Sequence, residues 1–371
     1  MSTQKADGSL LFETKVDEKG FDSGVKKLGG IAAKGMAAVG ASIVAAGTTV
    51  AGLGAAAIKV GIEFESAFAG VKKTVDASDE QLSALHDGLI DLSKEIPVTA
   101  AGLSAIAESA GQLGIDVDNI EEFTATMADL SVATNLTAEE AATSFARFAN
   151  IVGMSQENFD RLGSVVVALG NNLATTEAEI TAMAMRIAGA GSQVGLTEAQ
   201  IMAFSSALSS VGIEAEAGGT AFSTLISKMS LAVAQGGAAL TDFSDVAGMT
   251  GDEFREAFEQ DAGQAILSFI QGLARINDEG GSAIKTLDDI GLSDIRMRDA
   301  LLRASGASDV FAEALDIANT AWDENIALSK EAEQRYKTME SRLQMLKNSV
   351  SALGIAIYES TDEGLGSAVD L

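Results

Sequence analysis

The chain has no cysteine, one proline, one histidine and only 5% aromatic residues. Without cysteine it has no disulfide framework, no thiolate nucleophile and no sulfur-ligated zinc. Because strands favour aromatic and β-branched residues, this composition argues against a β-sandwich or a βαβ enzyme. A single proline leaves helices largely unbroken. These absences predict an all-α fold, an elongated assembly of many helices.

Positive charge is also scarce. There are 25 Lys and Arg against 53 Asp and Glu, which gives a formal net charge of -28. Since neutralisation of phosphates by Lys and Arg supplies most nucleic-acid affinity, we expect no direct nucleic-acid binding. The acidity is uneven, because residues 1–62 hold seven Lys and five Asp or Glu. The N-terminus lacks the basic start and apolar run of a secretory signal, which indicates synthesis in the cytoplasm.

One stretch, Gly35–Ile58, contains no charged residue and consists mostly of Ala, Gly and small aliphatic side chains. As a helix rising about 1.5 Å per residue, it is long enough to cross a hydrocarbon core of about 30 Å. Its five glycines lower both helix propensity and insertion energy. Small residues such as Gly47 and Ala51 favour close helix packing instead. Two interpretations stay open, a membrane span and a helix buried against copies of itself.

From Ser78 onward, recurring threonines predict helix starts. In four places a threonine precedes Glu or Gln by three positions, the pattern of a capping box. These pairs are Thr137 with Glu140, Thr176 with Glu179, Thr197 with Gln200, and Thr250 with Glu253. Another start is expected at Thr99, shortly after Pro97. Helix ends are expected at Gly114, Gly153 and Gly212, where a left-handed residue is favoured.

The segments that begin at Thr99, Thr137 and Thr197 resemble one another, which predicts a weak internal repeat of helical hairpins. Their spacing is too irregular for a regular solenoid. Between Gly236 and Gly251 the periodicity weakens, which predicts a loop before a second helical group.

Near the C-terminus, apolar residues alternate spacings of three and four, the period of a coiled-coil seam. The seam comprises Tyr336, Met339, Leu343, Leu346, Val350, Leu353 and Ile357. Extended backwards, the same frame reaches Trp322 and Leu315, with the less suitable Asn325 and Ser329 between. We expect one long helix from about Ser308 to Glu359 that becomes coiled-coil-like near its end.

These features divide the chain into five parts. They are an N-terminal arm (1–34), a Gly/Ala-rich apolar segment (35–61), a helical core (62–235), a second helical group (236–307), and a long helix that begins a coiled-coil rod (308–371).

Residues that could carry out chemistry are few. No serine–histidine–acid or metal cluster surrounds His86, so we interpret it as an ordinary helix-surface residue that could at most form a weak pH-sensitive contact. The segment Gly189–Gly195 has one residue too many for a dinucleotide loop and follows a helix, so we expect a helix stop.

Acidic residues also lack a special setting. Asp116, Asp118 and Glu122 lack the glycine and distal glutamate of a calcium loop, so a turn before a helix is expected. The pairs Asp288/Asp289 and Glu139/Glu140 fit a solvated helix face. No catalytic, cofactor-binding or metal-ligating residue is predicted, and no cofactor; an enzyme is not expected.

Three features, taken in order, resemble the N-terminal part of phage tail tape measure proteins. They are the opening ADGSLLFETKVDEKGFDSGVKKLGG, the Gly/Ala stretch, and the block from Ile62 to about Met229, which includes LSKEIPVTAAGLSAIAESAGQLGI and GLTEAQIMAFSSALSSVGIEAEAGGTAFSTLISKM. The resemblance covers about two-thirds of the chain and is specific in the order of its segments.

The resemblance implies a virion structural protein whose helical copies template tail-tube assembly, set tail length, and are ejected ahead of DNA. Its implied partners are its own copies, tail-tube and tail-tip proteins and tail assembly chaperones, with the host membrane as a further candidate on ejection. The implied location is the tail lumen after assembly in the host cytoplasm. Family members are usually far longer, and even a fully helical chain would span only about 560 Å. We therefore expect a short tail or a chain cut where the rod begins, near Leu371.

Overall fold

The structure is a computed structural model that describes residues 50–369. Contacts divide the chain into two units, Met1–Ala57 and Ile58–Leu371. Of the first unit, only residues 50–57, the beginning of a helix, lie in the described range. The N-terminal arm and residues 35–49 of the uncharged stretch lie outside the described residues.

Between residues 50 and 369 the chain forms 17 α-helices and one 3-10 helix, with no strand. This confirms the all-α fold class. In chain order the helices are α2 (Val50–Thr74), α3 (Asp79–Glu95), α4 (Ala100–Gln112), α5 (Val117–Ala133), α6 (Ala138–Val152), η1 (Gln156–Asn158), α7 (Phe159–Asn172), α8 (Glu177–Gln193), α9 (Glu198–Ser210), α10 (Ala215–Gln235), α11 (Gly237–Ala247), α12 (Gly251–Gln260), α13 (Ala262–Asp278), α14 (Ala283–Asp289), α15 (Ile295–Gly306), α16 (Ser308–Glu324), α17 (Ala327–Tyr336) and α18 (Met339–Val369).

All four capping boxes expected from the sequence are present. In each, the threonine side chain accepts a hydrogen bond from the backbone N–H three residues on, and that residue's side chain accepts one from the threonine N–H. The boxes begin α6, α8, α9 and α12. The expected start at Thr99 is also confirmed, since its side chain accepts a hydrogen bond from the Gly102 N–H.

Glycines end several helices in the left-handed region that an L side chain rarely adopts. Gly114, Gly153 and Gly212 follow α4, α6 and α9 with φ angles of 81°, 74° and 73°. Within the segment Gly189–Gly195, the last glycine follows α8 with a φ of 79°. The predicted helix stops are therefore confirmed.

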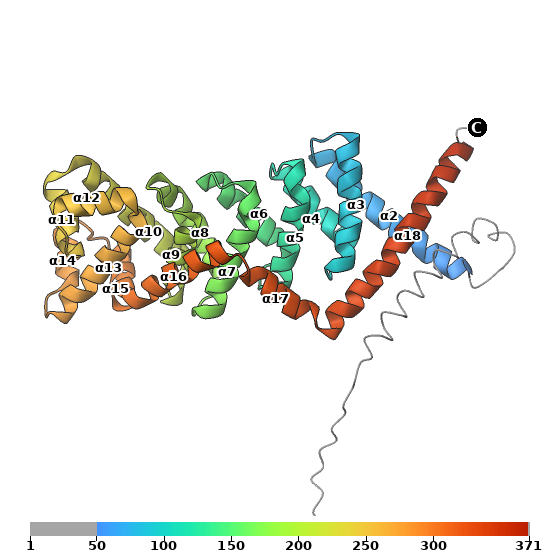
Figure 1. Cartoon of the computed structure of the whole chain (residues 1–371). Helices are drawn as coiled ribbons and strands as arrows, with labels where there is room; N and C mark the ends of the chain where they lie inside the picture. Colours follow the sequence, from blue (N-terminus) through green and yellow to red (C-terminus); the bar gives the residue numbers. More distant parts are fainter. Residues whose placement is uncertain (1–49, 370–371) are drawn as a thin grey trace, which may run out of the picture. The chain divides into compact units, whose positions relative to one another are not determined.

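Helices α3 to α15, which we call the helical stack, follow one another in chain order (Figure 1). Through its first part, each helix packs against the next helix but one: α3 against α5, α4 against α6, α5 against α7, α6 against α8, α7 against α9, and α8 against α10. The odd-numbered helices therefore form one row and the even-numbered helices the other. This two-row packing is the arrangement that repeated helical hairpins produce.

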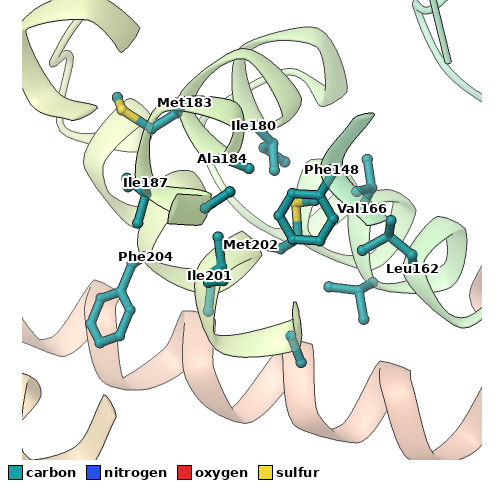
Figure 2. Packing of buried hydrophobic residues seen from close by; sticks show 14 of the residues in the cluster. Phe148, Leu162, Val166, Ile180, Met183, Ala184, Ile187, Ile201, Met202 and Phe204 are labelled. Atoms are coloured by element: carbon teal, nitrogen blue, oxygen red, sulfur yellow. The ribbon is translucent and has the colours of Figure 1, made fainter. Parts of the chain in front are cut away.

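The core of the stack lies between these rows. Figure 2 shows side chains of α6, α7, α8 and α9 meeting there, with Phe148, Ile180 and Ile201 among them. All three are buried. Alanines such as Ala184 let the helices approach closely, because a small side chain leaves little volume between the helix axes.

The last three helices run back along the odd-numbered row. Helix α16 packs against α9 and α7, α17 against α7 and α5, and α18 against α3. We call α16, α17 and α18 the returning helices. They are labelled α16, α17 and α18 in Figure 1, where the last of them is red.

The expected single helix from Ser308 to Glu359 is wrong, because the segment forms three helices. Helix α16 ends at Asn325, which has a φ of 51° and whose side chain is held by another helix. Helix α17 ends before Lys337, and the Thr338 hydroxyl accepts a hydrogen bond from the Ser341 N–H at the start of α18. Two local backbone turns therefore interrupt a seam that is almost continuous in the sequence.

The loop expected between Gly236 and Gly251 is also largely wrong, since Gly237–Ala247 form helix α11. Its buried residues Leu240, Phe243 and Val246 face α13 and α12. Gly272 of α13 allows the close approach, because a Cβ there would lie 1.7 Å from the Val246 carbonyl oxygen. The polar residues around these apolar positions hid the helical period.

No helix within residues 50–369 is both long and apolar enough to cross a membrane. The last residues of the uncharged stretch, Val50–Ile58, begin α2, which continues through charged residues to Thr74.

Candidate interaction site

The candidate site is the pair of surfaces presented by the returning helices, one buried against the helical stack and one exposed. Polar side chains fix the buried surface at four places. Each place joins residues far apart in the sequence, so none of them was predictable from local spacing.

The first place is the corner between α16 and α17. The Ser164 hydroxyl donates to the Asn325 side-chain oxygen at 3.1 Å, and the Asn325 amide donates to the carboxylate of Asp160. Arg161 donates to the Trp322 carbonyl oxygen at 2.7 Å. These contacts place the left-handed Asn325 directly on α7, and they satisfy the carbonyl at the end of α16 that has no helical partner.

The second place is a half-buried acid–phenol pair. The Tyr336 hydroxyl, on α17, donates a hydrogen bond to the Asp129 carboxylate on α5. Burial raises the pKa of Asp129, and the hydrogen bond from Tyr336 lowers it in part. Burial and the nearby Asp129 charge raise the pKa of Tyr336. Burial therefore disfavours the charged form of Asp129, while the hydrogen bond from Tyr336 partly stabilises it.

The third place is the end of α3. Asn348 of α18 is only 2% exposed, and its amide nitrogen lies 2.8 Å, 3.2 Å and 2.7 Å from the carbonyl oxygens of Ser93, Ile96 and Val98. Carbonyls at a helix C-terminus lack helical partners, so a buried amide donor satisfies them. Its side-chain oxygen accepts a hydrogen bond from Gln344 at 2.9 Å. Asn348 therefore fixes both the position and the rotation of α18 on α3.

The fourth place is His86, predicted as a helix-surface residue, whose side chain is 23% exposed and contacts both α2 and α18. Its ring lies 4.9 Å from the Phe64 ring and 5.0 Å from the Phe68 ring, and its Nε2 lies 3.0 Å from the Glu359 carboxylate on α18. Its Nδ1 lies 3.0 Å from Asp87.

Beside this histidine, α18 crosses α2. The Tyr358 hydroxyl donates to Glu65 at 2.6 Å, and the Tyr358 ring covers Gly61, where any Cβ would lie 2.3 Å from it. Together with Lys72 these residues line a hollow at the junction of α2, α3 and α18.

The exposed surface is a row of apolar side chains along α18, which we call the α18 row. Its members and exposed fractions are Met339 (68%), Leu343 (50%), Leu346 (37%), Val350 (61%), Leu353 (44%) and Ile357 (37%). These are six of the seven seam positions predicted from the sequence; the seventh, Tyr336, contacts Asp129 on α5. Upstream in the same frame, Leu315 is only 2% exposed and packs inside. The seam therefore changes from core to surface at the turn before Met339.

The remaining acidic candidates have ordinary surroundings. Asp116 begins α5, and Asp118 accepts a hydrogen bond from Gln81 at 3.3 Å, so the predicted turn and helix start are confirmed. Asp288 and Asp289 are exposed beside Arg298 and Lys285.

The second acidic pair, Glu139 and Glu140, is exposed in the first turn of α6, and Glu140 completes a capping box. In the part of the chain that the structure describes, no group of three or more His, Asp or Glu side chains is arranged to hold a metal ion.

Comparison with known families gives a match that lies within the helical stack. Residues 86–287, more than half of the chain, match the family described as phage-related minor tail protein. The chain belongs to this family. Comparisons with curated proteins and with solved structures gave no match. Membership indicates a structural component of a phage tail that contacts other tail proteins.

The family match runs from α3 to α14 and ends before the returning helices begin. The part of this phage tail protein that carries the family pattern is thus the helical stack, and the α18 row lies outside it. The two parts make distinct structural contributions, a folded body and an apolar surface on its last helix.

Proposed function

We propose that this phage tail protein is a tape measure protein, which sets tail length and serves as the scaffold on which tail-tube subunits assemble. The observation that carries the proposal is the combination of a phage-tail helical body with a long final helix bearing a coiled-coil period. A ruler needs a fixed rise per residue, which a continuous helix supplies at about 1.5 Å. Its partners in this role are its own copies, tail-tube and tail-tip proteins, and tail assembly chaperones.

The fold changes how such a ruler would measure. Helices α3 to α15 are stacked and α16 to α18 run back along them, so most residues do not each add 1.5 Å to one axis. Length would instead be set by continuous helix, of which α18 (Met339–Val369) is the longest in the described residues. The folded stack then acts as a body of constant size.

Tail length gives a direct test. Inserting three coiled-coil heptads, about 21 residues, directly after Ser360 should lengthen tails by about 30 Å in electron micrographs of phage carrying the altered gene. The matched control inserts the same residues at the turn between α13 and α14, beside Gly280, which has a φ of 82°. The control should leave the length unchanged. Equal tail lengths for both insertions and the parent would refute the ruler role.

We also propose that the protein leaves the tail ahead of the DNA. The net charge of -28 supports this, because an acidic chain in the lumen would repel DNA that later occupies the same space. The purified chain should then fail to shift DNA in a gel at physiological salt. Strong retention of DNA would contradict this part of the proposal.

Contact with the host membrane during ejection is a separate proposal, supported by the absence of charge from Gly35 to Ile58. A synthetic peptide of this stretch should float with liposomes in a density gradient. Failure to float would favour a role in packing against other helices.

A further inference from the structure

The α18 row is unusual because its apolar side chains are exposed along one side of the helix from Met339 to Ile357. Met339, Val350 and Leu343 are 68%, 61% and 50% exposed. The opposite side of the helix is used inside the protein, where Asn348, Ala352 and Ile355 are buried against the body. At 3.6 residues per turn the two sets face opposite directions. The row is therefore a second surface, in addition to the one that attaches α18.

The spacing of the row indicates what covers it. Its members recur at intervals of four, three, four, three and four residues from Met339 to Ile357, so they form one straight apolar stripe along the helix. The apolar stripe of another helix matches such a surface in shape and length.

A second copy of the same chain carries such a helix, already folded and held in place by its own α3. Because α18 is ordered before association, little conformational entropy is lost on pairing. In a symmetric dimer the same surface of each copy meets the other. Each contact between a residue of one copy and a residue of the second therefore occurs twice. The charges beside the α18 row decide whether the two helices run in the same or opposite directions.

A parallel pair in register is disfavoured by like charges. With Leu343 and Val350 in the first core position of the heptad and Leu346 in the second, Arg342 of one helix would lie beside Lys347 of the other. Both side chains are exposed. This repulsion would occur twice in the dimer.

An antiparallel pair removes the repulsion. When Leu343 of one helix lies opposite Leu346 of the other, Glu340 of each copy comes beside Lys347 of the second copy, and Arg342 comes beside the neutral Ser349. Shifting this pairing by one heptad in either direction sets Lys347 against Lys347 or Glu340 against Glu340. One antiparallel register therefore satisfies both the apolar seam and the charges.

We propose that two copies of the chain associate through the α18 row as an antiparallel helix pair with Leu343 opposite Leu346. This surface joins the folded bodies of two tail proteins back to back. The inference rests on the proposed action with its own copies, but it is measured by association of the purified protein. A failure of pairing therefore leaves the ruler role to the tail-length test, and the reverse also holds.

Charge reversal tests the orientation. In sedimentation equilibrium of the full chain, Lys347→Glu should weaken dimerisation roughly tenfold, because it replaces two attractive contacts by two repulsive ones. The double variant Glu340→Lys/Lys347→Glu should restore it. Lys330→Glu makes the same charge change on an exposed position of α17 and should leave association unchanged.

Three results would overturn the proposal. Tighter association of Lys347→Glu would indicate a parallel pair, since the substituted carboxylate would then lie beside Arg342 of the other copy. Association that none of the α18 variants alters would show that another part of the chain, such as Gly35–Ile58, mediates it. A parent chain that stays monomeric at all concentrations tested would show that the row binds another protein.

Cysteine cross-linking tests the register, and the chain supplies a clean background because it has no cysteine. Leu343→Cys and Leu346→Cys, each oxidised alone, should form little disulfide dimer. An oxidised mixture of the two variants should form abundant disulfide dimer, because only then do two cysteines face each other across the pair. Efficient cross-linking of either variant alone would exclude the proposed register.

Discussion

The helical stack and the returning helices are both all-helical, but different interactions stabilise them. In the stack, five helices begin at capping boxes and several end at left-handed glycines, so many helix ends are specified by residues within one turn. Of the returning helices, α16 and α17 begin without a side-chain cap, and polar contacts of the three helices reach residues 161 to 293 positions away. The stack is thus specified locally and the returning helices by the surface they cover.

This difference predicts that the two regions can be separated energetically. The returning helices depend on a stack that is already formed, whereas the stack has caps and a core of its own. Damage to the contacts between them should therefore release the returning helices while the stack stays folded. The predictions below test this, from the largest expected effect to the smallest.

The strongest perturbation is at the apolar centre of the contact between α16 and the stack. Phe311 is completely buried, and its ring lies 6.4 Å from that of Phe204. Phe311→Ala should cost about 3–5 kcal/mol of stability, because it leaves a large cavity. Urea unfolding measures this cost. Hydrogen exchange should speed up chiefly in α16, α17 and α18.

A matched variant within the stack should behave differently. Phe148 of α6 is 1% exposed, and Phe148→Ala should cost a similar free energy. Its hydrogen exchange should rise in the stack and in the returning helices together, since the returning helices need a folded stack to pack on. If both variants give the same exchange pattern, the two regions form one cooperative unit and the comparison fails.

The second perturbation removes one amide. Asn348→Asp replaces a buried donor by a carboxylate that faces the carbonyl oxygens at the end of α3. The variant should cost about 2–3 kcal/mol, because a buried charge would lack a partner. Hydrogen exchange in α18 should rise strongly, with the stack unchanged. Ser349→Ala, one residue away, is the control and should have little effect.

A third perturbation examines Tyr336 and Asp129. Tyr336→Phe removes the donor and should cost about 1–2 kcal/mol at neutral pH, because a hydrogen bond to a charged group is lost. Asp129→Asn keeps an acceptor for Tyr336 and removes the charge, so at pH 7 it should equal or exceed the parent in stability. Chemical unfolding measures both variants.

The pH dependence follows from the sign of the shift. Burial raises the pKa of Asp129 in the folded protein above the ordinary 3.8. Its contribution to stability is therefore complete below pH 3.8 and is lost as the pH rises through the higher folded value. The advantage of Asp129→Asn over the parent should grow with pH across that window and vanish in acid. An advantage that is constant with pH would exclude Asp129 as its cause.

Sequence reasoning succeeded where the determinant is local. The capping boxes and the glycine stops each depend on residues within a turn or two, and the structure confirms them. The row was predicted as part of a coiled-coil seam, and its apolar side chains are exposed. What the sequence did not reveal is that the other side of the same helix attaches to α3.

Two of the failures, at Asn325 and at His86, share one physical cause. Asn325 interrupts the predicted long helix because Ser164 and Asp160, about 160 residues earlier, hold its side chain. His86 is partly covered because Glu359 returns to it from the last helix. Nothing within the neighbouring residues signals these contacts, and only the return of the chain along the odd-numbered row creates them. The polar character of Asn325 at a seam position was the one signal that could have located the break.

The smallest expected effects are at the helix caps. Cap substitutions should leave the stack folded, so they test whether each stack helix is specified by its own end. Thr197→Ala should cost about 1 kcal/mol at all pH values, since its partner in the capping box is the neutral Gln200.

The box at Thr137 has Glu140 instead, and the Thr137 N–H and hydroxyl lower the pKa of that carboxyl below its usual 4.5. Its contribution is therefore present above pH 4.5 and is lost as the pH falls through the lower folded value. Glu140→Gln should remove this acid sensitivity, as measured by stability between about pH 3 and 6 against the parent. Because each cap acts on one helix, hydrogen exchange should rise only in the first turns of α9 or α6. If exchange in the returning helices rose instead, the caps would not be acting locally.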